Sequence, residues 1–145
     1  MSEPKTSLDV EFLFKLQVTT GDRTHALIRG GPHGMRAIVP VVDGTFEGPR
    51  VKGTVVAPGG DWVTVRQNGV SKLDVRIQLV TDDNEPILMT YTGLLVRNDD
   101  GTTTVRTTPL FETGAEKYAW LNDVQAVALG STEGDQVMYD VYALK

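Results

Sequence analysis

The stretch GTFEGPRVKGTVVAPGGDWVTVRQNG, residues 44–69, combines strand-forming residues with eight glycines or prolines. Asp43-Gly44 and Asn68-Gly69 bracket it, and such pairs tolerate the positive φ values that tight hairpin turns require. Gly48-Pro49 interrupts strand hydrogen bonding, which predicts a bulge, and Gly59-Gly60 predicts a further turn. Because bulges are frequent at barrel rims, the stretch is predicted to form hairpins at the rim of a β-structure.

Apolar and polar residues alternate along much of the remaining chain. In residues 8–16 the apolar side chains Leu8, Val10, Phe12, Phe14 and Leu16 share one face, and in residues 73–79 Leu, Val and Ile alternate with Asp74, Arg76 and Gln78. A period of two indicates strand rather than helix. Further strands are predicted at residues 36–42, 50–57, 62–66, 87–97, 103–111, 124–130 and 136–144, and only residues 114–121 suit a turn or two of helix.

Many strands at short spacing, joined by hairpin turns, predict an antiparallel all-β fold. About eight or nine strands favour a closed or nearly closed barrel, since closure removes exposed edges, and a sandwich is the competing architecture. No linker, internal repeat or low-complexity segment divides the 145 residues. Residues 1–145 are therefore predicted to form one domain.

The composition narrows the function classes. The net charge is −5 and the basic residues are scattered, so no basic stripe suggests a nucleic-acid partner. The absence of cysteine excludes disulfides, thiolate catalysis and metal sites built from cysteine. The N-terminal segment MSEPKTSLDVEF is polar, so neither a signal peptide nor a membrane helix is expected and the default localisation is cytoplasmic.

Several motifs resemble a known family in order along the chain: RGGPHGMR, GTFEGPRVKGTVVAPGGDW, NGVSKLDVRIQLVTDDN and FETGAEKYAWLND. Together they resemble the DUF3237 (UPF0311) family of small β-barrel proteins, from about Arg29 to the C-terminus. The resemblance implies a barrel similar in shape to the allene oxide cyclase-like barrels. It implies little about the reaction, because a shared fold is a weak argument for a shared chemistry.

Asp74 and Arg76 are the first candidate site residues, with Asp74 as an acid or base and Arg76 as an anion anchor. They lie two residues apart on one face of a strand. Either that face is solvated and the Leu/Val/Ile face forms the core, or the polar face lines the inside of a barrel that binds a ligand. The resemblance favours the second alternative, because Leu-Asp-x-Arg is one of its anchors.

Other candidates come from the quoted stretch and from the C-terminal half. Glu47, beside the predicted bulge, is either a second acid or base or a surface partner of Arg50. Trp62 is either a core residue or an aromatic wall beside Asp61, which is itself a turn residue or an acid. The remaining candidates for substrate binding are Arg36, Tyr91, Arg106, Trp120 and Asn122, and the amide of Asn122 could instead hold a loop.

Metal and cofactor chemistry find no support in the motifs. The two histidines, His25 and His33, have neither HxH nor HxxxH spacing, and residues 30–34 are neither a P-loop nor a dinucleotide-binding fingerprint. No metal and no cofactor are therefore expected.

Two functional hypotheses remain open from the sequence. The first is a cofactor-independent isomerase, cyclase, hydratase or related lyase that acts on a small organic molecule, with carboxylates as acid and base and arginines as anchors. The second is a non-catalytic barrel that binds a ligand or serves as a scaffold. A homo-oligomer is compatible with both hypotheses.

Overall fold

The structure is a computed structural model and describes residues 2–22 and 27–145. These residues form ten strands and one short 3₁₀ helix: β1 (Val10–Thr20), β2 (Ile28–Gly31), β3 (Gly34–Glu47), β4 (Lys52–Val65), β5 (Ser71–Thr81), β6 (Pro86–Arg97), β7 (Thr103–Thr107), β8 (Leu110–Glu112), η1 (Glu116–Asp123), β9 (Ala126–Glu133) and β10 (Gln136–Leu144).

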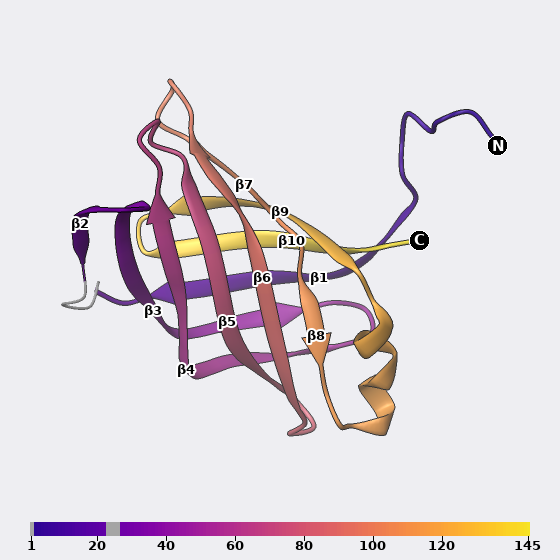
Figure 1. The fold of residues 1–145 in the computed structure, drawn as a ribbon. Helices are drawn as coiled ribbons and strands as arrows, with labels where there is room; N and C mark the ends of the chain where they lie inside the picture. Colours follow the sequence, from indigo (N-terminus) through magenta and orange to yellow (C-terminus); the bar gives the residue numbers. More distant parts are fainter. Residues whose placement is uncertain (1, 23–26) are drawn as a thin grey trace.

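Eight of these strands close into an antiparallel barrel (Figure 1). The sheet runs β1-β10-β9-β7-β6-β5-β4-β3, and β1 also pairs with β3, which joins the two edges. β2 extends β3 beyond the closed ring, and β8 pairs with β6 below β7. The predicted antiparallel β-barrel with one short helix is confirmed.

Apolar side chains fill the barrel, as the alternation in the sequence predicts. On β5, Leu73, Val75, Ile77 and Leu79 are buried, whereas the intervening side chains are exposed. Val105 of β7 and Val141 of β10 are also fully buried within the same continuous core. Burial of such side chains, at about 25 cal/mol per Å² of apolar surface, is the main force that holds the barrel together.

The first strand departs from the predicted alternation. Leu8, Val10 and Phe12 are exposed, whereas Phe14 and Leu16 are buried as expected. The register of β1 against β10 shifts between Phe12 and Phe14. The extra residue there turns the side chains of the preceding residues to the opposite face of the sheet. The prediction of one common face for residues 8–16 was therefore wrong for its first half.

The glycines of the quoted stretch play different roles from those predicted. Gly48-Pro49 forms the turn between β3 and β4, where the Gly48 N–H donates to the Val51 carbonyl oxygen at 3.0 Å, and not a bulge. Asp43-Gly44 lies within β3 and Gly59-Gly60 within β4, so neither is a turn, and the strands predicted at 50–57 and 62–66 are one strand.

The physical reason is close approach between strands. A Cβ on Gly44 would collide with the Gln17 carbonyl oxygen of β1, so this glycine lets β1 and β3 pair. The strand register shifts beside Asp43-Gly44 and beside Gly59-Gly60, but neither β3 nor β4 ends there. Asn68-Gly69 is the predicted turn, with Gly69 at a φ of 87°.

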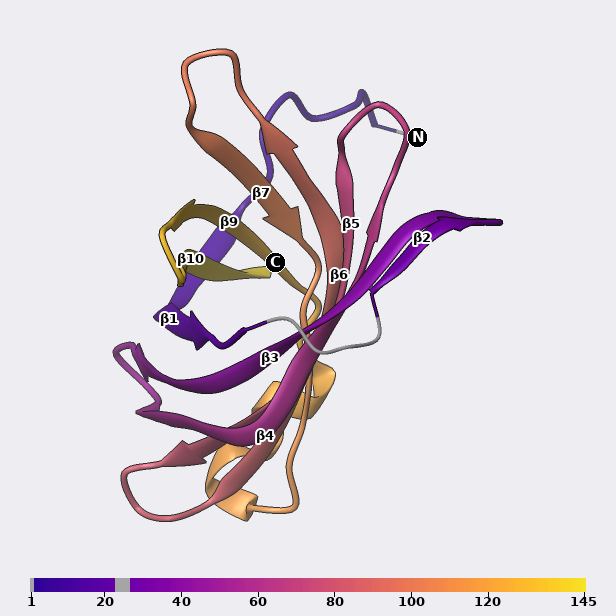
Figure 2. The same ribbon diagram turned by 90° about the vertical axis from the view of Figure 1, so that its left-hand side faces the viewer.

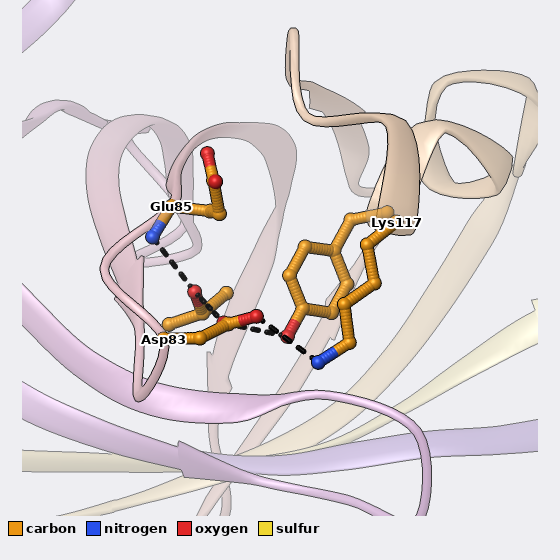
Figure 3. Close-up of polar contacts among 5 residues, drawn as sticks. Asp83, Glu85 and Lys117 are labelled. Carbon is orange, nitrogen blue, oxygen red and sulfur yellow. Dashed lines mark hydrogen bonds and ion pairs between the residues drawn. The ribbon is translucent and has the colours of Figure 1, made fainter.

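The helix η1 closes one end of the barrel, and a polar cluster attaches it to the β5–β6 turn (Figure 3). Asp83 accepts hydrogen bonds from the Tyr118 hydroxyl at 2.7 Å, from Lys117 Nζ at 3.0 Å and from the Thr81 hydroxyl at 2.5 Å. The Glu85 N–H donates in turn to the Thr81 hydroxyl. The hydrogen bonds from Thr81, Tyr118 and Lys117 hold the pKa of Asp83 below its usual range.

Beneath this helix, aromatic rings fill the closed end. Phe14 packs edge-on against Phe46 and Phe111, with ring centroids 5.4 and 5.9 Å apart, and Leu121 of η1 is buried in the same cluster. At the opposite end the β4–β5 and β6–β7 hairpins extend beyond the barrel (Figure 2). The two ends therefore differ: among the described residues, the end with the long hairpins carries no helix.

Candidate functional site

The structure places Asp74 and Arg76 on the outer face of β5. Both alternate with buried residues and are exposed, so the interpretation that they line the barrel was wrong. The physical reason is that burial of the Leu/Val/Ile face is worth far more than enclosing two charged groups. Arg76 faces the exposed ring of Trp62, with its guanidinium carbon 5.8 Å from the ring centroid.

Glu47 and Arg106 also lie outside the barrel, where they line a surface groove of about 680 Å³. Exposed apolar side chains, among them Leu129 and Met138, line the same groove. Arg106 donates from Nη1 to the Val105 carbonyl oxygen at 2.9 Å. The structure therefore brings two predicted site residues together on the outer surface, apart from Asp74 and Arg76.

Three further predicted residues are dispersed. Arg36 is exposed on β3, opposite Thr64. Trp120 is partly buried in η1, and the guanidinium carbon of Arg50 lies 3.6 Å from its ring centroid. Asn122 bonds both backbone groups of Thr113, accepting from N–H at 2.8 Å and donating to C=O at 3.0 Å, so its amide holds a loop.

Inside the barrel, toward the end without the helix, one small cavity contains ionisable side chains from three strands. Asp61 of β4, Tyr91 of β6 and Tyr139 of β10 line it. The remaining lining is apolar apart from one threonine: Val18, Thr20, Val41, Leu73, Val75, Leu95 and Val137. Of the nine predicted site residues, only Tyr91 contributes to this cavity.

Asp61 faces the interior because of its place in the strand register. It pairs with Val75 of β5, whose side chain is buried in the core. Its Oδ1 accepts a hydrogen bond from the Asp74 backbone N–H at 3.0 Å. Burial raises the pKa of Asp61 from 3.8 to about 6, and the negative charge of Asp74 adds to this effect, while the hydrogen bond from the Asp74 amide opposes it.

Tyr91 and Tyr139 form an aromatic pair in the same cavity. Their ring centroids lie 5.4 Å apart at an interplanar angle of 71°, and both side chains are buried. Burial is the main cause that raises the pKa of each hydroxyl. Tyr139 raises the pKa of Tyr91 next, the hydrogen bond with Tyr91 lowers that of Tyr139, and the negative charge of Asp61 raises both. Both hydroxyls therefore stay neutral hydrogen-bond donors throughout the physiological pH range.

The cavity has a volume of about 50 Å³. Complete small-molecule sites usually measure about 300–1,000 Å³, so this space suits the reacting group of a ligand and not a whole drug-sized molecule. A carboxyl group with a pKa near neutrality can take up and return a proton, and two neutral hydroxyls can donate to a developing oxyanion. The arrangement is thus equipped for proton transfer at one functional group.

Sequence reasoning gave Asp61 only as a turn residue or an acid beside Trp62, and it did not single out Tyr139. Asp61, Val63 and Val65 occupy every second position along β4, so the sequence could have placed all three side chains on the same face of one strand. The turn predicted at Gly59-Gly60 hid this pattern. For Tyr139 the signal was a glycine on the paired strand, because a Cβ at Gly130 would lie 2.5 Å from the Tyr139 ring.

Candidate metal ligands do not cluster among the residues that the structure describes. They contain no group of three or more His, Asp or Glu side chains placed to hold an ion. His33 is exposed in the turn between β2 and β3, and His25 lies outside the described residues. Within residues 2–22 and 27–145, no helix is both long and apolar enough to cross a bilayer.

These features define a small antiparallel β-barrel with an acidic, tyrosine-lined interior cavity. The family model DUF3237, a protein of unknown function, matches residues 8–144. The chain belongs to the DUF3237 family, as the sequence motifs predicted.

Proteins similar to this chain include a fungal enzyme with a named activity. A UPF0311 protein of Bradyrhizobium diazoefficiens is 31% identical over 149 residues, covering 94% of this chain and 96% of that protein. The hydroalkoxylation enzyme phnH of Penicillium herquei is 30% identical over 127 residues, covering 83% of this chain and 73% of that enzyme.

Solved structures share the fold. A β-barrel-like protein of Acinetobacter baumannii matches with a TM-score of 0.90 at 29% identity, covering 99% of this chain and 100% of that chain. An enzyme from Penicillium herquei matches with a TM-score of 0.77 at 24% identity, covering 100% of both chains. These matches show the β-barrel fold.

Proposed function

We propose that this protein is a cofactor-independent enzyme that adds the O–H bond of a hydroxyl group across an activated C=C bond of a small organic molecule. The same enzyme would catalyse the reverse elimination. The observation that carries the proposal is that Asp61, Tyr91 and Tyr139 line one cavity. Burial raises the pKa of Asp61 there to about 6. The relative that is named a hydroalkoxylation enzyme supports the same reaction class.

The proposed step balances without an oxidant or reductant. The ionised Asp61 carboxylate accepts the proton of the attacking hydroxyl, while the oxygen of that hydroxyl forms the new C–O bond. The π electrons of the C=C bond move onto a conjugated carbonyl oxygen, and the tyrosine hydroxyls stabilise that enolate by hydrogen bonding. Protonated Asp61 then returns the proton to the α-carbon, so the net change is addition of O–H.

Asp61 takes the role for which the sequence suggested Asp74 and Glu47. Those two carboxylates are exposed, and neither lines the cavity. Arginine anchors have no place in this scheme, because no arginine is among the described residues that line the cavity. The tyrosine hydroxyls replace them as neutral donors.

The test measures ring closure of an ortho-hydroxyaryl enone through the loss of its absorbance. We expect turnover by the wild type, a loss of about 10²-fold or more in Asp61→Asn, and a loss of about 10²-fold in Tyr139→Phe. Asp82→Asn removes the same charge from an exposed site on the β5–β6 turn and should keep full activity.

Two results would count against catalysis at this site. If Asp61→Asn turns over the enone at the wild-type rate, Asp61 is not the base. Saturable binding of the enone without turnover would instead favour the non-catalytic ligand-binding alternative.

A further inference from the structure

The chemistry of the cavity lining selects the charge of the ligand. Among the described residues that form it, the lining holds one carboxyl group and two tyrosine hydroxyls, and Lys, Arg and His are absent. The other lining side chains are valine, leucine and one threonine. An anion placed there would meet the Asp61 carboxylate in a poorly solvated space with no basic side chain from the lining to offset the repulsion.

We infer that the cavity binds the uncharged end of its ligand, a group that carries both a hydrogen-bond donor for Asp61 and an acceptor for the tyrosine hydroxyls, and that it discriminates against carboxylates and other anions. This inference names the substrate class for the proposed function and uses the same site. Hydroxyl, enol and carboxamide groups satisfy the requirement, and their apolar remainder matches the valine and leucine walls.

The groups that face Asp61 make the discrimination depend on pH. Asp74 of β5 contributes its backbone N–H and a negative charge, Tyr91 and Tyr139 contribute neutral hydroxyls, and β3 places the uncharged Val39 opposite. Burial raises the pKa of Asp61 to about 6. Below that pH the protonated carboxyl becomes a donor, and an anion can then bind.

A matched pair of small probes tests the inference: trifluoroacetamide, which is neutral, and trifluoroacetate, which has nearly the same shape and stays an anion throughout the range. Binding is followed by ¹⁹F NMR relaxation. At pH 8 we expect the amide to bind at least tenfold more tightly than the carboxylate. Between pH 8 and pH 5 the affinity for trifluoroacetate should rise at least tenfold, with a midpoint near 6.

Two variants complete the test. Asp61→Asn should bind trifluoroacetate at every pH about as well as the wild type does at pH 5, because the amide is neutral and keeps a donor. Asp82→Asn, at the closed end, should behave as the wild type does.

Equal affinities for the two probes at pH 8, no binding of either, or an unchanged preference in Asp61→Asn would each overturn the inference. The outcome is separable from that of the proposed function. A preference for the amide without turnover would support the inferred ligand class and refute the proposed catalysis. Turnover without this preference would support the proposed catalysis and refute the inferred ligand class.

Discussion

Replacing Asp61 by asparagine should stabilise the protein at neutral pH. The side chain is half-buried, and burial raises its pKa from 3.8 to about 6. A carboxyl with a raised pKa in the folded state favours folding below its unfolded pKa, and this contribution is lost as the pH rises through the folded value. Above pH 6 the ionised group therefore costs stability, and asparagine has no charge to bury.

The rise from 3.8 to about 6 corresponds to about 3 kcal/mol between acidic and neutral pH. Partial exposure reduces the effect, so we expect Asp61→Asn to gain about 1–3 kcal/mol at pH 8 and at most about 0.5 kcal/mol at pH 4. The asparagine oxygen can still accept from the Asp74 N–H, so this hydrogen bond is not lost.

Urea unfolding at pH 4 and pH 8 measures both differences. At pH 8 the gain corresponds to roughly 3–4 °C of melting temperature for each kcal/mol in a chain of this size. Asp82→Asn, an exposed carboxylate at the other end of the barrel, should show neither the gain nor its pH dependence. A stability difference that is the same at pH 4 and pH 8, or a loss at pH 8, would refute the raised pKa of Asp61.

Three further outcomes are expected. Asp83→Asn should lower the melting temperature at pH 7 and still do so at pH 4, with convergence on the wild type only in stronger acid, because a lowered carboxyl pKa preserves its stabilisation to below 3.8. Gly130→Ala should cost about 1–3 kcal/mol in urea unfolding because its Cβ would press on the Tyr139 ring, whereas Gly114→Ala meets open space and should cost little. Arg76→Ala should change the turnover of the ortho-hydroxyaryl enone by less than about threefold, because its side chain lies outside the barrel; a larger loss would return the outer face of β5 to the site.

The fold was largely predictable because alternation and turn chemistry are local signals. Leu73, Val75, Ile77 and Leu79 point inward as their spacing indicates, and Asn68-Gly69 makes the turn that such a pair favours. Prediction failed where a glycine serves a distant strand, because nothing near Gly44 shows that β1 will pass against it.

The site was mostly not predictable for a related reason. Charged pairs such as Asp74 and Arg76 attract attention in a sequence, but their facing depends on which side of the sheet becomes the core. Asp61 and Tyr139 are separated by most of the chain, and only closure of the barrel through the β1–β3 pairing brings their strands around one cavity. That closure is a long-range event without a local signature.

Among the described residues, the helix η1 lies at one end of the barrel, and the cavity with Asp61 lies toward the other end, which carries no helix. Under the proposed function, we expect substrate to enter and product to leave at that end. Product should therefore inhibit competitively, and release should slow as the product becomes larger. A long substrate must also enter with its reacting end first, which fixes its orientation before any hydrogen bond is made.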